Sequence, residues 1–507
     1  MAFEVNRCPL SSETVVEKLN AAKEAGELEE TLVDLFMNYE MDMRTTWECR
    51  KVFQNLPEET YQKYPVLITT RALIEAMAGR LDNVEKIVEP LGKTPDDLNG
   101  YVCNRLDISR IMMEVVLPQY DNEEFTRRAV YLAKTLKSPI SRLALTACRP
   151  SVINGFRDMT PICGNIEEKK DAICEAIDMI YGHSGKGVYE VGLAEWKYET
   201  GDMFGALLTL ASVIPTLEDE KDVRCLFAAY ILQMRILVIK GQTQINSEIF
   251  DKIRDKITTH HYEELEASLD AVICLYHCYE ADFSYVEDWL SSNAPNENGE
   301  VFLMDMYPYL VKMRCYLQTG KYMLTTILAK KMMNYLKQSH RPHDMCECML
   351  LSAIACLKAG DEENAIEEFE QALSTGEQYG YVRLFADEGQ VVVELIKLHK
   401  EKLKVTNEGD HRIFNEDWLK KIRSYAIEVA NRYPNYLKTK QEEYANLTKT
   451  EKQIVLLMSA GLPNEEIAIQ MDKKEKTIKF HITNIFTKLR VKNRQQAINR
   501  AREIGYL

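Results

Sequence analysis

The fold is decided by the C-terminal stretch Leu447–Leu507, which reads LTKTEKQIVLLMSAGLPNEEIAIQMDKKEKTIKFHITNIFTKLRVKNRQQAINRAREIGYL. Its first helix begins with Thr448 and Glu451, which have the spacing of a capping box, where each side chain satisfies the amide of the other residue. Apolar residues then recur at intervals of three and four positions, as one face of a helix requires. Gly461 ends this helix, because glycine tolerates the left-handed conformation of a C-cap. A short helix with defined ends is therefore expected.

Three more short helices are expected in close succession. Pro463 suits the first turn of the second helix, and after a short polar turn the pattern predicts a third helix over roughly 475–489. Asn493 with Gln496 has the spacing of another cap, so a fourth helix should run to Ile504. Short helices joined by tight turns are typical of a helix-turn-helix module, in which one helix enters the major groove of DNA. The stretch therefore predicts a DNA-binding module.

The third helix has two distinct faces. At 100° per residue its core stripe consists of Ile478, Ile482, Ile485, Phe486 and Leu489. The opposite face consists of Lys476, Lys479, Phe480, Thr483, Asn484 and Thr487. Phe480 is a large apolar side chain that points away from the core, where it could meet a thymine methyl group. Lys479 could reach guanine acceptors, and Thr483 or Asn484 could read a base edge.

The same stretch resembles the LuxR-type (GerE-like) helix-turn-helix. The match runs without gaps through all four helices and rests on Leu447, Thr448, Glu451, Gly461, Asn464, Glu466, Ile467, Ala468, Thr477, Lys479, His481, Ile485, Lys488, Leu489, Val491, Arg494 and Ala497. The resemblance implies a bacterial transcription factor that binds inverted half-sites of double-stranded DNA as a homodimer. Two departures concern only which sequence is read: Glu465 replaces a common lysine, and Phe480 replaces a smaller residue.

The resemblance also implies roles for individual residues. It places base contacts near Lys479, Phe480 and Thr483. Together with the helix face described above, DNA contacts are expected from Lys476, Thr477, Lys479, Phe480, His481, Thr483, Asn484 and Lys488, the last of them near phosphate. Dimer contacts are expected in the last helix, from Ala497, Ile498 and Ala501. RNA polymerase and an unidentified small-molecule or protein effector are further expected partners, and no membrane partner is expected.

Charge is divided unevenly along the chain. Residues 447–507 hold 12 Lys and Arg against 6 Asp and Glu, a net charge of +6. The whole chain has a net charge of −15, so residues 1–446 have a net charge of −21. A basic end on a strongly acidic body is typical of a dedicated DNA-binding module. The body itself should repel phosphate.

The body contains short turns between helices at a fixed period. Their small residue stands at Gly201, Gly241, Ala281, Gly320 and Gly360, at spacings of 40, 40, 39 and 40 residues. An earlier pair, Ala72–Leu91, has Gly79 at the corresponding place, and Tyr120–Asp121 begins 41 residues further on. A period of about 40 residues with two helices per unit is typical of a helical-repeat solenoid, whose units share one continuous core. We therefore expect an all-α fold: a tetratricopeptide-like superhelix followed by a four-helix module.

The repeat region resembles the superhelical sensor domain of MalT-like LuxR-type regulators, through Tyr381–Gly389 and Tyr189–Asp202. Those regulators begin with an ATPase domain, for which this sequence offers only Gly182–Gly187 as a phosphate loop. Two residues instead of four separate its first two glycines, and a glycine follows its lysine where a serine or threonine must reach magnesium. A loop between repeats is the better interpretation, and no nucleotide or other cofactor is expected.

Thirteen cysteines, an odd number, are scattered through the chain. No apolar signal segment and no run approaching 18 apolar residues occurs, so a cytoplasmic protein with reduced thiols is expected. His340, His343, Cys346 and Cys348 could supply a tetrahedral metal site. However, Cys346 and Cys348 stand two apart on a helix and should point in different directions, and Pro342 at a helix start explains the local sequence. Neither a metal site nor an enzyme is expected.

Three domains are expected. Residues 1–396 form the helical-repeat sensor, residues 397–446 form a helical linker and tether, and residues 447–507 form the DNA-binding module. Within the linker the charged run His399–Lys404 suggests a loop, and Ile413–Tyr433 suggests one more helix. An alternative function, of a different class, is a repeat-based adaptor that titrates a partner protein and does not use its C-terminal module for DNA.

Overall fold

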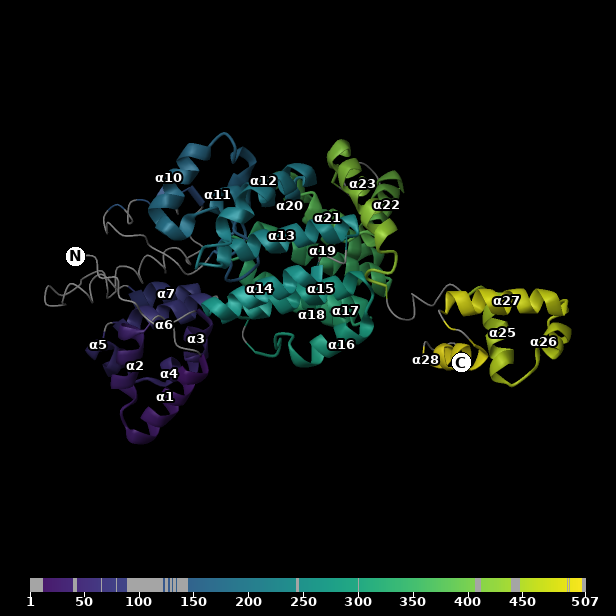
Figure 1. Ribbon diagram of the computed structural model, residues 1–507, viewed down its shortest axis with the longest axis horizontal. Helices are drawn as coiled ribbons and strands as arrows, with labels where there is room; N and C mark the ends of the chain where they lie inside the picture. Colours follow the sequence, from purple (N-terminus) through teal and green to yellow (C-terminus); the bar gives the residue numbers. More distant parts are fainter. Residues whose placement is uncertain are drawn as a thin grey trace.

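The computed structural model describes residues 12–39, 43–64, 66–78, 80–88, 145–242, 246–299, 301–405, 412–438, 447–489 and 493–503, together with Val491 and single residues between 122 and 134. Within these ranges every regular element is a helix (Figure 1). The predicted all-α class is therefore confirmed. None of the helices in these ranges combines the length and the apolar character that crossing a membrane requires.

Short helices form the first part of the chain. They are α1 (Ser12–Ala25), α2 (Leu28–Asn38), α3 (Met43–Glu48), α4 (Arg50–Asn55), α5 (Glu58–Lys63), α6 (Val66–Met77) and α7 (Leu81–Val88). Trp47 stacks on Phe302 of the repeat array, with ring centroids 4.8 Å apart. The early repeat turn predicted at Gly79 and the position Tyr120–Asp121 lie outside the described residues.

Paired helices make up the repeat array, which is coloured blue to green in Figure 1. After α10 (Lys170–Tyr181) the pairs are α11 (Val188–Glu199) with α12 (Met203–Leu217), α13 (Arg224–Lys240) with α14 (Asn246–His260), α15 (Glu266–Tyr279) with α16 (Phe283–Ser292), α17 (Met306–Gln318) with α18 (Tyr322–Leu336), and α19 (Pro342–Ala359) with α20 (Glu362–Tyr379). All five turn residues have a positive φ: 93° at Gly201, 76° at Gly241, 55° at Ala281, 74° at Gly320 and 83° at Gly360. The left-handed turn conformation thus recurs at the positions that the sequence predicts.

An aspartate follows the turn residue in three of these pairs and caps the second helix. The side chain of Asp202 accepts a hydrogen bond from the Gly205 amide at 2.8 Å. Asp282 and Asp361 make the corresponding bonds to the amides three residues further on, both at 3.2 Å. Left-handed turn and aspartate cap together explain why the chain reverses at these points.

The array ends in α21 (Arg383–Ala386), α22 (Gln390–Val405) and α23 (Glu416–Arg432). The charged run His399–Lys404 lies in α22, so the predicted loop is wrong. His399 is buried, with its Nδ1 3.0 Å from Glu370 Oε1, while Glu401 and Lys404 face solvent. The helix expected over Ile413–Tyr433 is α23. Both helices share the hydrophobic core of the array, which extends to Leu437, and the predicted limit between residues 396 and 397 stays a prediction.

An irregular segment, residues 145–159, joins the beginning of the array to its end. The Glu195 carboxylate of α11 accepts two amides of this segment at 3.0 Å each. Arg341 directly precedes α19, and its guanidinium donates to three carbonyls of this segment at 2.7–3.1 Å. Arg149 of the segment pairs with Asp344 of α19 at 2.8 Å. Buried charges of the array are therefore satisfied by a piece of the same chain.

The C-terminal module has a hydrophobic core of its own. Its helices, drawn in yellow in Figure 1, are α25 (Lys449–Ser459), α26 (Asn464–Gln470), α27 (Glu475–Lys488) and α28 (Arg494–Glu503). Buried residues from Leu447 to Ala501 form one cluster, and those from Val15 to Leu437 form another. Separate cores are typical of separate domains.

Candidate nucleic-acid interface

The N-terminal cap of α25 has the predicted reciprocal bonds. The Thr448 amide donates to Glu451 Oε2 at 2.6 Å, and the Glu451 amide donates to Thr448 Oγ1 at 3.2 Å. Gly461 follows the helix with a φ of 83°. Local chemistry alone therefore defines the first helix of the module.

The two faces of α27 separate as the sequence predicts. Ile478, Ile482, Ile485 and the following Leu489 are buried in the module core. On the other side Phe480 is 63% exposed, although it is a large apolar residue. Lys476, Lys479 and Thr483 are also exposed, and Thr477, His481 and Asn484 are half-buried. Most of the residues predicted to contact DNA thus share one accessible helix face.

Two interactions on this face bear on Lys479. Its Nζ lies 2.6 Å from Glu475 Oε1 one turn earlier. The hydrogen bond to Glu475 raises the pKa of Lys479, so the side chain stays charged. The Thr483 hydroxyl donates to the Lys479 carbonyl at 3.0 Å and keeps its acceptor lone pairs for a base. A guanine would therefore compete with Glu475 for Lys479.

Lys488 already has a partner inside the module, although its side chain is 33% exposed, and its contact with phosphate stays a prediction. Its Nζ lies 2.7 Å from Glu451 Oε2 and 3.0 Å from Oε1. Only 3% of the Glu451 side chain is exposed. The ammonium of Lys488 is therefore committed to a carboxylate inside the module, where it connects α27 to α25.

The residues predicted to make dimer contacts lie in the core of the module. Ala497 and Ala501 are 0% exposed and Ile498 is 8% exposed, because all three pack into the module core. In this conformation these side chains offer a second copy little surface, and the dimer contacts expected from them stay a prediction. The outward side of α28 consists of Gln495, Gln496, Asn499 and Arg502. A dimer that uses α28 would meet these polar residues.

Arg494 is a structural residue to which sequence reasoning assigned no role. Its Nη2 donates to the Leu462 carbonyl at 2.6 Å and to the Met458 carbonyl at 3.2 Å. Its Nη1 donates to Asn464 Oδ1 at 3.2 Å. A cation at the C-terminal end of α25 also complements the helix dipole. Arg494 thus fixes the turn between α25 and α26, and its joint presence with Asn464 in the family pattern was the available signal.

Two family models match the chain. Residues 445–501 match the luxR family of bacterial regulatory proteins, and residues 180–402 match the MalT-like TPR region. The chain joins a MalT-like TPR region to a luxR-family domain. Both predicted resemblances are therefore confirmed.

Curated relatives divide in the same way. The HTH-type transcriptional regulator MalT of Vibrio cholerae is 22% identical over 317 residues, which are 58% of this chain and 33% of the relative. MalT of Vibrio parahaemolyticus is 25% identical over 299 residues, 53% of this chain and 31% of the relative. The response regulator protein VraR of Staphylococcus saprophyticus is 39% identical over 74 residues, 15% of this chain and 35% of the relative. The chain spans about a third of the length of each.

The side chains of His340, His343, Cys346 and Cys348 do not converge on one point in the structure. Cys346 Sγ lies 3.3 Å from the Ala372 carbonyl on α20, whereas Cys348 Sγ lies 3.5 Å from the Ala329 carbonyl on α18. His343 is buried with its Nε2 3.5 Å from Glu199 Oε2, and His340 is exposed. The two thiols thus point to different helices, as their spacing predicts.

The glycine-rich stretch Gly182–Gly187 connects α10 to α11. Gly182–Gly185 forms a single 3-10 turn. Gly187 takes a φ of 76° at the start of α11, and Lys186 forms an ion pair with Glu220. The interpretation as a connecting loop agrees with this geometry.

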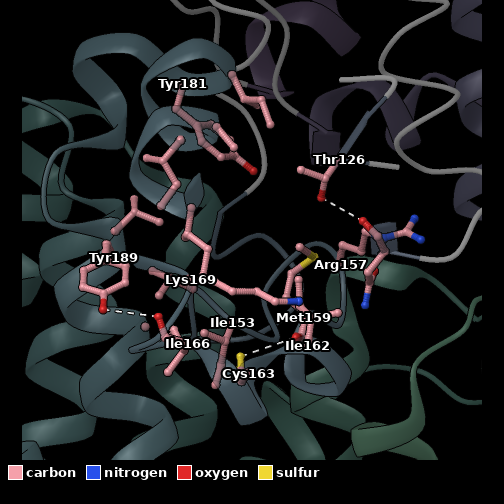
Figure 2. A pocket seen from close by; sticks show the side chains of 18 of the residues that line it. Thr126, Ile153, Arg157, Met159, Ile162, Cys163, Ile166, Lys169, Tyr181 and Tyr189 are labelled. Atoms are coloured by element: carbon pink, nitrogen blue, oxygen red, sulfur yellow. Dashed lines mark hydrogen bonds between the residues drawn. The ribbon is translucent and has the colours of Figure 1, made fainter. Parts of the chain in front are cut away.

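An apolar pocket that sequence reasoning missed lies beside α10 (Figure 2). It has a volume of about 470 Å³. Its apolar wall consists largely of Ile153, Met159, Ile162, Ile173, Ile177 and Tyr181. In Figure 2 the side chain of Lys169 extends across it toward Met159. The isoleucines of α10 recur at helical spacing, which was the available signal that this helix has an apolar face.

Proposed function

We propose that this protein is a transcription regulator that binds promoter DNA sequence-specifically through α27 of its luxR-family domain, as a homodimer. The observation that carries the proposal is the accessible face of α27. Phe480, Lys479 and Thr483 lie there while the isoleucines of the same helix fill the core. One face of this helix is fixed in the module core, and the opposite face presents cationic, polar and apolar groups. Such a helix can read base edges in a major groove.

The N-terminal end of α27 supports the same orientation. Lys474 precedes the helix without a side-chain hydrogen bond to its first amides, and Lys473, Lys474 and Lys476 are exposed around it. Amides at a helix start attract phosphate, both by hydrogen bonding and through the helix dipole. In the proposed complex this end contacts the DNA backbone, and the following turns contact bases.

The names of the relatives support regulation as the role of the whole protein. MalT is a transcriptional regulator and VraR is a response regulator. We assign reception of an effector to the TPR region, with the apolar pocket beside α10 as the place for a small, largely apolar molecule. Lys169 would supply a cation for an acidic group on that molecule. Recruitment of RNA polymerase follows as part of the same proposal.

Selection of genomic fragments with the purified full chain tests the proposal, followed by titration of the enriched fragment with variants. Lys479→Ala should weaken operator binding by about 1–3 kcal/mol and blur base preference at one position. Glu475→Gln should strengthen binding, because it frees Lys479 and removes a negative charge near phosphate. Lys452→Ala removes an equal charge from the exposed side of α25 and should leave base preference unchanged.

Two outcomes would contradict the proposal. One is the absence of any enriched fragment, which would favour an adaptor that titrates a partner protein. The other is equal operator affinity for wild type and Lys479→Ala, which would remove α27 as the recognition helix.

A further inference from the structure

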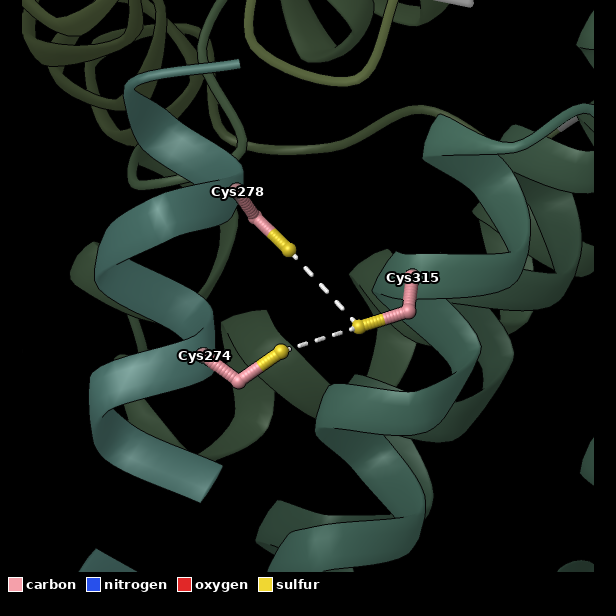
Figure 3. Close-up of side chains that lie close together, drawn as sticks. All are labelled: Cys274, Cys278 and Cys315. Carbon is pink, nitrogen blue, oxygen red and sulfur yellow. Dashed lines mark hydrogen bonds between the residues drawn. The ribbon is translucent and has the colours of Figure 1, made fainter. Parts of the chain in front are cut away.

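Three buried thiols meet where α15 and α17 lie side by side (Figure 3). Cys274 and Cys278 stand one helical turn apart on α15, so both side chains face the same neighbour. The Sγ of Cys315 on α17 lies 3.4 Å from Cys274 Sγ and 3.7 Å from Cys278 Sγ. All three residues are 0% exposed and carry free thiols.

The spacing of the sulfurs suits coordination of one ion. All three lie within 4.8 Å of one another. Zinc–thiolate bonds are about 2.3 Å long, so sulfurs at tetrahedral angles around one zinc are about 3.8 Å apart. The observed separations of 3.4 and 3.7 Å are close to this value. Only small side-chain movements would place a soft ion among the three, and soft ions are those that thiolates select.

The surroundings favour a complex without net charge. All three cysteines are fully buried, and a buried site disfavours any charge that has no partner. Arg314, the preceding residue, is already paired with Glu347 at 2.8 Å and with Glu388. Three thiolates around a monovalent or divalent ion would leave a net negative charge in a dry interior, which is costly. A trivalent ion leaves none.

The number of donors leads to the same class of ion. Among the described residues the cluster offers three sulfur ligands, and no other candidate ligand completes it. Zinc in a structural site completes a tetrahedron with a fourth ligand. Trivalent arsenic keeps a lone pair and binds three ligands in a pyramid, which matches three thiols on two helices.

We propose that Cys274, Cys278 and Cys315 form a three-thiolate site for a trivalent thiophilic ion, which enters as arsenite, As(OH)₃. Three As–S bonds form and three As–O bonds break. Each thiol proton leaves with a hydroxide as water, and no atom changes its oxidation state. The product is neutral, as its buried position requires.

The site lies beside contacts that hold the C-terminal end of the TPR region. Tyr279, next to Cys278, stacks on Tyr436 with ring centroids 4.2 Å apart. The side chain of Gln318, three residues after Cys315, accepts the Leu437 amide at 2.8 Å. Ligation that draws α15 and α17 together acts on the residues that precede the luxR-family domain. This link to regulation rests on the proposed function, whereas ion binding does not.

Native mass spectrometry of the phosphine-reduced full chain with one equivalent of arsenite tests the site. The wild type should gain one arsenic and lose three hydrogens. Cys278→Ala and Cys315→Ala should each lose this adduct, and Cys225→Ala, which removes another buried thiol, should keep it. X-ray absorption at the arsenic edge of the wild type, which needs no variant to fold, should show three sulfur neighbours and no oxygen.

A wild type without the adduct, an adduct that persists in Cys315→Ala, or a first shell containing oxygen would each overturn the site. Operator titration with and without arsenite separates the two proposals. A three-sulfur site with unchanged operator affinity overturns the regulatory link alone. A three-sulfur site in a protein that selects no DNA overturns the proposed function alone.

Discussion

Lys488 Nζ lies 2.7 Å from Glu451 Oε2, and the same oxygen accepts the Thr448 amide at 2.6 Å. The C-terminal end of α27 is therefore tied to the N-cap of α25. Because the Glu451 side chain is only 3% exposed, its charge depends on these partners rather than on water. The pair therefore orients the proposed recognition helix, while the Lys488 side chain stays 33% exposed beside it.

Lys488→Ala should destabilise the luxR-family domain by about 1–3 kcal/mol, because a buried carboxylate loses a charged hydrogen-bond partner. Chemical denaturation of the full chain, with hydrogen exchange read at the amides of α25 and α27, measures this loss. The double variant Glu451→Gln with Lys488→Ala provides the control. It should be more stable than the sum of the single effects predicts, and strictly additive losses would refute the coupling.

Acid should act on the same pair. Burial raises the pKa of Glu451, but hydrogen bonds from Lys488 and Thr448 outweigh it and place the pKa below its usual 4.5. Since the folded-state pKa is the lower one, the stabilisation is complete above about pH 4.5 and is lost as pH falls through the folded-state value. The domain should therefore lose stability on acidification more steeply in the wild type than in Glu451→Gln. Parallel stability curves would count against this account.

Gly360→Val should destabilise the TPR region by about 1–3 kcal/mol through backbone strain. Gly360 has a φ of 83°, and an added Cβ would contact nothing within 4 Å, so the cost comes from the conformation and not from a clash. Ala281→Gly is the matched opposite change, because Ala281 already takes a φ of 55°; it should stabilise by up to about 1 kcal/mol. Thermal unfolding of both full-length variants decides the matter, and a shift of the same sign in both would contradict the argument.

Residues 447–507 expressed alone should fold, because they bury a core that shares no member with the array. They should bind operator more weakly than the full chain if the body contributes to dimerisation. Circular dichroism and titration with the selected fragment measure the two properties. An unfolded fragment would refute the proposed domain limit at Leu447.

Local features of the fold could be predicted from the sequence, because neighbouring residues determine them. The Thr448–Glu451 cap and the left-handed turn at Gly360 depend on residues a few positions apart. The loop predicted at His399–Lys404 failed for a related reason. Its lysines and glutamate lie on the outer side of α22, whereas His399 is buried. The sequence of the run does not show this burial, because distant helices cause it.

Pairing across helices could not be predicted in this way. Lys488 lies on the rim of α27, and nothing local shows that it pairs with a carboxylate 37 residues earlier. Ala497 and its neighbours are small and apolar, a character that suits both a core and a dimer interface. The three thiols meet because Cys274 and Cys315 are 41 residues apart, close to one repeat period. That spacing was visible in the sequence, but the direction of the side chains was not.

The irregular segment 145–159 has a consequence for how this protein can evolve. Repeat arrays ordinarily gain or lose units, because each unit contacts only its neighbours. Here Arg149 pairs with Asp344, 195 positions away, and the Glu199 carbonyl at the end of α11 accepts the Val382 amide beyond the last pair at 3.1 Å. An inserted or deleted unit would separate these partners and leave buried charges unpaired. The number of repeats between these partners is therefore fixed. New binding specificities must arise by substitution within the existing units, not by their duplication.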